Sequence, residues 1–199
     1  MIQRDLAKRL IAHLTRPDEH PNVLLLEGAR QVGKTTLVEA LGPKLGREML
    51  TLNLEEDRRT VDDLNRCASF SDFETYLAVT HQFRGDGRRA ICIDEAQESP
   101  TLGRFVRFMK EKWHHTPVIL TGSSIGRIFD PETRFPVGRV TRFLLQPFSF
   151  REFLRCGGVE DLLGHHDDVQ THERVASLSG VNPEGGEEGR RIENESTIG

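Results

Sequence analysis

Eight consecutive residues, Gly28-Ala-Arg-Gln-Val-Gly-Lys-Thr35, constrain the fold of this chain more than any other feature. They lie between an apolar run at 22–27 and a segment at 34–45 whose apolar residues recur at helical spacing. Glycines allow a sharp turn, so that N–H groups of the loop and of the helix start point at one place. A chance match is expected about once in a hundred chains of this length. The segment therefore predicts a phosphate-binding loop between a buried strand and a helix.

The residues of this loop are expected to share the binding of a nucleoside triphosphate. Lys34 would reach the β and γ phosphates, and the Thr35 hydroxyl would bind Mg²⁺. The side chains of Arg30 and Gln31 are interpreted either as solvated or as contacts to a partner, and Thr36 as a packing residue. The predicted nucleotide-binding segment is Gly28, Ala29, Arg30, Gln31, Val32, Gly33, Lys34, Thr35 and Thr36.

A second apolar run, 89–94, ends in the acid pair Asp94-Glu95. At a strand end beside a phosphate loop, Asp94 would hold Mg²⁺ through water, and Glu95 would orient or deprotonate an attacking water. Two adjacent acids favour hydrolysis of bound nucleotide over a kinase or small GTPase. The sequence therefore predicts a Mg²⁺-dependent nucleoside triphosphatase, with an ATPase as the favoured class.

Apolar runs alternate with helical patterns along the chain, which is typical of an α/β fold with a mostly parallel sheet. An amphipathic N-terminal helix is expected to pack on the domain, and Ser149 with Glu152 forms a capping box. The expected strands are 22–27, 48–53, 89–94, 117–121 and 138–145. The expected helices are 34–45, one or two within 57–84, 101–115, a short one in 123–129, and 149–155. Together these elements predict a three-layer domain with five strands.

Charge is unevenly divided along the chain. The formal net charge is −4, but residues 157–199 hold ten acidic residues and three arginines. Few large apolar residues occur there, which predicts a disordered acidic tail. The mildly acidic total argues against a dedicated nucleic-acid binder. No stretch reaches the ~18–20 apolar residues that span a bilayer, and the spacing of the cysteines fits neither a metal nor a redox pair. A reduced, soluble, cytoplasmic protein without a membrane contact is expected.

Four motifs in order resemble those of a known family, the prokaryotic AAA-type ATPases that usually carry a nuclease-like C-terminal domain of unknown function. The motifs are Gly28–Thr36, Ile93-Asp-Glu-Ala-Gln97, Leu120-Thr-Gly-Ser-Ser124, and Gly138-Arg139 followed by Gln146-Pro-Phe-Ser-Phe-Arg-Glu-Phe-Leu154. The resemblance covers about residues 1–155. It implies ATP as the nucleotide and a sheet in which the strand ending at Thr121 lies between the loop strand and the acid strand.

The same resemblance implies further site residues. Thr121 and Ser123 are candidates for the polar sensor near the γ-phosphate, with an ordinary strand-to-helix turn as the alternative. Gln97 would orient water or begin a helix. Arg139 matches the arginine of the family's Gly-Arg element, so it would stabilise γ-phosphate charge in cis or across a subunit contact. A surface arginine at a strand end is the alternative, and Arg127 and Arg134 are weaker candidates for the same role.

We therefore expect an ATPase domain at 1–155 and an acidic tail at 156–199 in place of the family's second domain, as in a truncated or frameshifted product or a fragment. Hydrolysis would couple nucleotide state to an attached domain, a protein partner or another copy of the chain. Two alternatives stay open. One is a nucleotide-binding switch or remnant with negligible hydrolysis. The other is a DNA-associated ATPase, based on the family's nuclease-like domain and the mildly basic residues 1–156.

Overall fold

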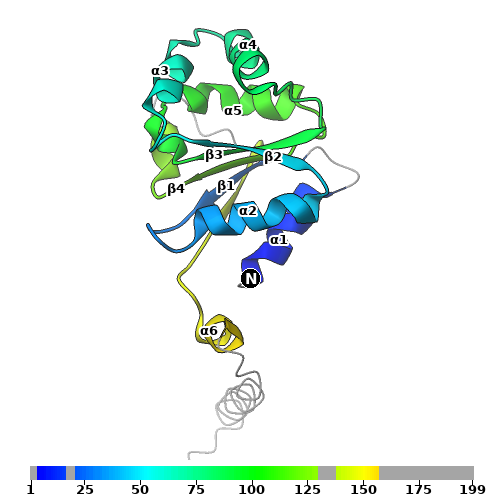
Figure 1. Cartoon of the computed structure of the whole chain (residues 1–199), viewed down its shortest axis with the longest axis vertical. Coiled ribbons are helices and arrows are strands. Elements are labelled where there is room, and N and C mark those ends of the chain that lie inside the picture. Colours follow the sequence, from blue (N-terminus) through cyan, green and yellow to red (C-terminus); the bar gives the residue numbers. More distant parts are fainter. Residues whose placement is uncertain (1–3, 17–20, 130–137, 157–199) are drawn as a thin grey trace, which may run out of the picture.

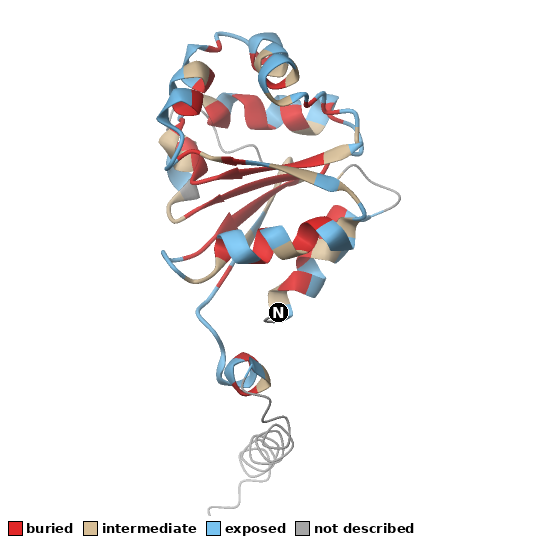
Figure 2. Cartoon of the chain, in the orientation of Figure 1, coloured by how far each residue is buried: buried red, intermediate tan, exposed pale blue. Residues whose placement is uncertain are grey.

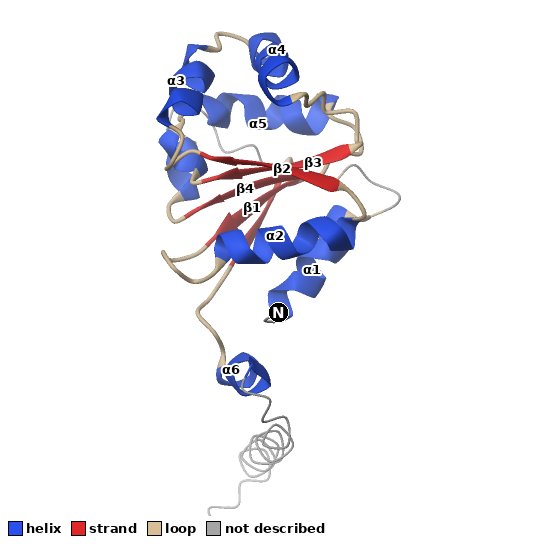
Figure 3. Ribbon diagram, in the orientation of Figure 1, coloured by secondary structure: helices blue, strands red, loops and turns tan. Residues whose placement is uncertain are grey.

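The computed structural model describes residues 4–16, 21–129 and 138–156, and within these ranges five parallel strands form one sheet (Figures 1 and 3). The strand order is β2-β3-β4-β1-β5. The strands are β1 (Val23–Glu27), β2 (Glu48–Asn53), β3 (Arg89–Asp94), β4 (Val118–Gly122) and β5 (Val140–Leu144). The helices are α1 (Asp5–Leu14), α2 (Lys34–Leu45), α3 (Arg58–Arg66), α4 (Phe70–His81), α5 (Thr101–Lys112) and α6 (Phe150–Cys156). Two short 3₁₀ helices are η1 (Ala96–Glu98) and η2 (Ile125–Ile128).

The central strands are apolar throughout because helices cover both faces of the sheet. Successive residues of β1 point to opposite faces. Leu24 and Leu26 pack with α1 and α2, whereas Val23 and Leu25 pack with α3, α4 and α5. Figure 2 shows the buried strands between the two helical layers. This arrangement is the three-layer α/β fold that the sequence predicts.

Aromatic side chains fill the layer between the sheet and α3, α4 and α5. Phe73 stacks on Phe105 with ring centroids 5.2 Å apart, and Trp113 stacks on Phe73 at 5.7 Å. Trp113 also explains why α5 is shorter than the predicted helix 101–115. Its backbone leaves the helical conformation, which places the ring in this cluster. The proline at position 117 then disfavours a helical residue before it.

Several sequence predictions about individual elements are confirmed. β4 lies between β1 and β3, and the segment 57–84 forms two helices. The capping box is present, since the Ser149 N–H donates to Glu152 Oε2 at 2.9 Å and the Glu152 N–H to Ser149 Oγ at 3.2 Å. The strands predicted at 117–121 and 138–145 run from 118 to 122 and from 140 to 144. The predicted acidic tail beyond α6 lies outside the described residues.

Candidate functional site

The loop between β1 and α2 lies at the carboxyl edge of the sheet. Gln31 and Gly33 have left-handed backbone conformations, with φ of 63° and 89°. Such residues in a tight loop turn successive N–H groups towards one concavity. Gly28 is required for another reason, because a Cβ there would lie 2.6 Å from the carbonyl oxygen of Leu145. The loop therefore has the shape of an anion-binding cradle in front of the first turn of α2.

Lys34 is held over this cradle although it is only 6% exposed. Its Nζ donates to the carbonyl oxygens of Gly28 and Ala29, both at 3.0 Å, and lies 3.9 Å from Glu95 Oε1. A cavity of about 500 Å³ borders the ammonium group. Its lining residues are Arg30, Gln31, Gly33, Lys34, Thr35, Thr36, Glu55 and Glu95. The cavity thus offers a buried cation and loop N–H groups to an anionic ligand.

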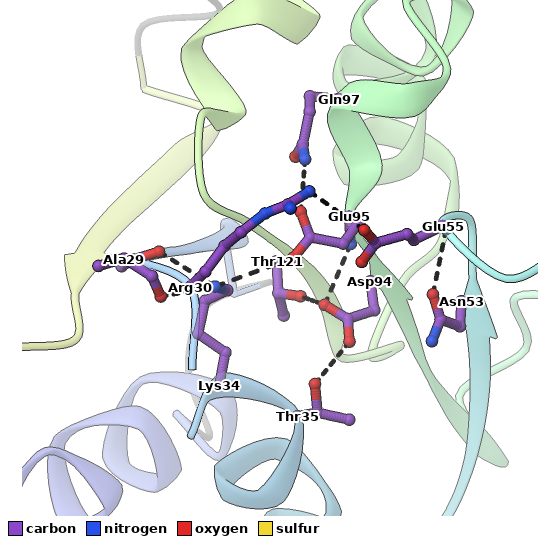
Figure 4. A network of polar contacts seen from close by, with 11 residues as sticks. Ala29, Arg30, Lys34, Thr35, Asn53, Glu55, Asp94, Glu95, Gln97 and Thr121 are labelled. Carbon is purple, nitrogen blue, oxygen red and sulfur yellow. Dashed lines mark hydrogen bonds and ion pairs between the residues drawn. The ribbon is translucent and has the colours of Figure 1, made fainter. Parts of the chain in front are cut away.

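Asp94, at the end of β3, receives three hydrogen bonds, as Figure 4 shows for its side-chain partners. Thr35 Oγ1 donates to Asp94 Oδ2 at 2.7 Å, the Glu95 N–H donates to Oδ1 at 3.0 Å, and Thr121 Oγ1 donates to Oδ1. The two segments predicted to hold Mg²⁺ therefore meet. A hydroxyl and a carboxylate are among the oxygen ligands that Mg²⁺ takes, so the chemistry of Thr35 and Asp94 fits the ion.

The Thr121 side chain is fully buried, and its hydroxyl is bonded to Asp94. In this structure it therefore supports the position of the Asp94 carboxylate. Its role as a sensor of the γ-phosphate stays a prediction. Ser123 lines a separate hollow of about 430 Å³ next to Gly28 and Ala29.

Glu95 faces the same cavity from a strained position. Its φ of 49° places a non-glycine residue in the left-handed region, which costs about 1–3 kcal/mol. The carboxylate accepts a hydrogen bond from Gln97 Nε2, and its other oxygen faces Lys34 Nζ. Among the described residues no group donates to Gln97 Oε1, which is buried. The pair therefore places a carboxylate that lines the cavity next to a buried amide oxygen that has no donor among the described residues.

Arg139 does not reach the loop of its own chain, so the predicted role in cis is wrong. It precedes β5, and its carbonyl accepts from the Val23 N–H at the opposite edge of the sheet. The five residues of β1 separate it from the loop by about 16 Å at ~3.3 Å per residue. Its guanidinium also pairs with Glu111 at 3.0 Å. Arg134 lies outside the described residues, and Arg127 is exposed beside the Ser123 hollow.

Two residues of the site were missed from the sequence. Glu55 follows β2 and forms an ion pair of 3.1 Å with Arg30 across the cavity lining. The rule that parallel strands end at one edge could have found it. Arg4 donates to the Val32 carbonyl at 2.9 Å. Nothing in the local pattern around Arg4 indicates this contact.

A second cavity, of about 380 Å³, adjoins the first. Gln31, Gly33 and Thr36 line both. The other lining residues are Arg4, Ala7, Val32, Leu37, Ala40, Lys44 and Phe148. Its walls are largely apolar and include one aromatic ring, with Arg4 and Lys44 as the cationic side chains of the lining. Such walls suit a ring system with a large apolar face.

The site lacks a cluster typical of a protein-only metal centre, because no group of three or more His, Cys, Asp or Glu side chains in the described ranges could hold an ion. None of the helices in these ranges is long and apolar enough to cross a bilayer. The charged and hydroxyl side chains that line the loop cavity are instead those of Arg30, Lys34, Thr35, Thr36, Glu55 and Glu95.

Comparison with known proteins agrees with this geometry. A family model described as an AAA domain matches residues 20–154. The replication factor C large subunit of Natronomonas pharaonis is 33% identical over 79 residues, which is 40% of this chain and 15% of that protein. The chain thus covers a small part of that relative. The family match spans the sheet, the loop and the acid pair, and the chain belongs to the AAA ATPase family.

Proposed function

We propose that this chain binds ATP with Mg²⁺ and hydrolyses it, with the phosphates in the loop cavity. One observation carries the proposal. The Thr35 hydroxyl and the Asp94 carboxylate, 59 positions apart in sequence, lie 2.7 Å from each other beside Lys34. A parallel sheet brings such residues together at its carboxyl edge. Their chemistry matches what a triphosphate with its metal ion needs.

Each cavity residue has a distinct part in binding. The loop N–H groups between Gly28 and Thr36 receive the phosphate oxygens. When a triphosphate binds, Lys34 Nζ would donate to the β and γ phosphates instead of to the carbonyl oxygens of Gly28 and Ala29. Thr35 and Asp94 hold Mg²⁺, which, when bound, neutralises charge on the phosphate oxygens. Thr121 keeps the Asp94 carboxylate in position.

Glu95 is the proposed base. Its carboxylate takes a proton from the water that attacks the γ-phosphorus, the new oxygen–phosphorus bond forms, and the bond to the departing ADP breaks. Gln97 Oε1, which is buried without a donor among the described residues, can accept a hydrogen bond from the second O–H of this water and so orient it for attack. Lys34 and Glu95 neutralise each other while the cavity holds no phosphate.

The nucleoside part of ATP is placed in the second cavity, where the base would lie against the Phe148 ring and the alkyl walls formed by Ala7, Leu37 and Ala40. Apolar walls hold a purine by contact area rather than by its hydrogen-bonding edge. Preference for ATP over GTP is therefore proposed from the family alone.

Phosphate release by the purified chain tests hydrolysis. Glu95→Gln should lower turnover by ~10²–10⁴-fold without abolishing nucleotide binding. Glu98→Gln is the matched control, because Glu98 pairs with Arg58 on the surface. Nucleotide binding without phosphate release by the wild type would reject the ATPase and leave a nucleotide-binding switch. Substantial turnover that is equal in wild type and Glu95→Gln would reject the role of Glu95 and leave the ATPase standing. Equal loss in both variants would reject the role of Glu95.

The ATPase unit would be formed by residues 1–155. Arg139 would stabilise γ-phosphate charge in the site of a neighbouring copy of the chain, across a subunit contact. In that case turnover per chain rises with protein concentration in the wild type. The rise disappears in Arg139→Ala. Turnover per chain that changes neither with protein concentration nor in Arg139→Ala would remove Arg139 from the mechanism.

A further inference from the structure

Arg4 is a charged residue buried to the same degree as the hydrophobic core, with 6% of its surface exposed. It is the N-cap residue of α1, and yet its partners belong to three other parts of the chain. Arg4 NH1 donates to the Val32 carbonyl at 2.9 Å, NH2 donates to the Gln146 carbonyl, and Nε donates to Glu152 Oε1 at 3.0 Å. The guanidinium also lies over the Phe148 ring, 4.3 Å from its centroid. One planar side chain therefore joins the phosphate loop to the segment that leads into α6.

The contact with Val32 has a consequence for the next residue. In a trans peptide the carbonyl of one residue and the N–H of the following residue point in opposite directions. Arg4 lines the second cavity but not the loop cavity, whereas Gly33 lines both. Because Arg4 holds the Val32 carbonyl on its own side, the Gly33 N–H is directed away from Arg4. It then faces the side where phosphate oxygens are received.

The other end of the contact is the start of α6. Glu152 Oε1 accepts from the Asp5 N–H at 3.0 Å as well as from Arg4, and Oε2 accepts from the Ser149 N–H at 2.9 Å. Burial raises the pKa of the Glu152 carboxyl, but the N–H groups of Ser149 and Asp5 and the Arg4 charge outweigh burial and hold the pKa below its ordinary value. Glu152 is thus ionised at neutral pH, and Arg4 is its buried counter-charge.

We propose that Arg4 is a positioning residue that sets the Gly33 N–H for phosphate binding, and that its ion pair with Glu152 links this setting to the docking of α6. The inference rests on the proposed function. In Figure 1, α6 lies beyond the sheet and is joined to β5 by an extended segment. Among the described residues, α6 is the C-terminal element. Nucleotide in the loop would therefore favour docked α6, and docked α6 would favour nucleotide.

Two substitutions separate this coupling from simple loss of folding. Arg4→Lys keeps the charge beside Glu152, but a point-like ammonium cannot reach all three acceptors as the planar fork does. Glu152→Gln keeps the size of the side chain and does not touch the loop. Arg155→Ala is the matched control, since the Arg155–Asp5 pair of 2.7 Å joins the same two helices and leaves the loop alone. Thermal melting first establishes that each variant is folded.

The experiment measures affinity for a fluorescent ATP analogue with Mg²⁺ and for inorganic pyrophosphate. Arg4→Lys and Glu152→Gln should each weaken binding of both by about tenfold, the change expected when one hydrogen bond is lost. Arg155→Ala should bind within about twofold of wild type. Amide hydrogen exchange at residues 150–156 is the reciprocal readout. ATP analogue should slow it in wild type and Arg155→Ala, but not in Arg4→Lys.

The possible results are distinguishable. Wild-type affinity in a folded Arg4→Lys and Glu152→Gln overturns the inference while the proposed function stands. An equally large loss of affinity in all three variants, or exchange at 150–156 that does not respond to nucleotide in wild type, also overturns it. No binding of either ligand by the folded wild type removes the proposed function and the inference together.

Discussion

Substitution of Thr121 by valine tests the internal support of Asp94, the acid proposed to bind Mg²⁺. The two side chains have nearly the same shape, so the change removes only the hydroxyl that donates to Asp94. A hydrogen bond to a charged group contributes ~1.5–3 kcal/mol. Asp94 keeps its donors Thr35 and the Glu95 N–H, so we expect the lower part of this range, about 1.5–2 kcal/mol of unfolding free energy.

For a domain of this size such a loss lowers the melting temperature by about 3–8 °C. Urea unfolding without nucleotide gives the free energy directly. Thr141→Val is the matched control on β5, which β1 separates from β4, because the Thr141 hydroxyl accepts from the neutral Asn22 amide at 3.3 Å. Thr141→Val should lower the free energy of unfolding by less than about 1 kcal/mol. Equal stability of Thr121→Val and wild type, or equal loss in both variants, would refute the reasoning.

Two further predictions concern titrating groups. Burial, with the Asp94 charge, raises the pKa of the Cys92 thiol well above its ordinary value, whereas Cys156 is exposed. A maleimide at pH near 7 should therefore label Cys156 and leave Cys92 unmodified until the protein unfolds, as followed by mass spectrometry, and rapid labelling of native Cys92 would contradict the burial. The pKa of Glu152 is lower in the folded protein than the ~4.3 of a glutamate in the unfolded chain, so ionised Glu152 stabilises the fold at pH values above ~4.3. This stabilisation is lost as the pH falls through the folded-state pKa. The urea midpoint of wild type should fall between about pH 5 and pH 3 more than that of Glu152→Gln, and parallel curves for the two proteins would rule this contribution out.

Elements whose determinants are local could be predicted from the sequence. The segment Lys34–Leu45 begins after a loop glycine and ends before Gly46, and α2 has these bounds. Asp94 could be placed near Thr35 because all strands of a parallel sheet end at one edge. In each case the relevant pattern lies within about ten consecutive residues or follows from the topology.

Features that depend on tertiary packing could not be predicted. α5 ends early because Trp113 enters a cluster built by residues from α4 and α5. The family's Gly-Arg element suggests a phosphate contact for Arg139, but the register of β5 beside β1 puts this residue at the other edge. Arg4 meets Glu152 across 148 positions. No local pattern encodes a contact of that separation.

Titration of the purified chain with a fluorescent ATP analogue and Mg²⁺ tests directly whether the loop cavity binds nucleotide. The Lys34→Ala and Lys8→Ala variants are titrated in the same way. Lys34 is buried at the loop cavity, whereas Lys8 is exposed on α1. Loss of charged hydrogen bonds worth ~1.5–3 kcal/mol each should weaken binding by at least about tenfold in Lys34→Ala. We expect saturable binding by wild type and Lys8→Ala, with this loss confined to Lys34→Ala. No saturable binding by folded wild type, or equal affinity in all three proteins, would contradict it.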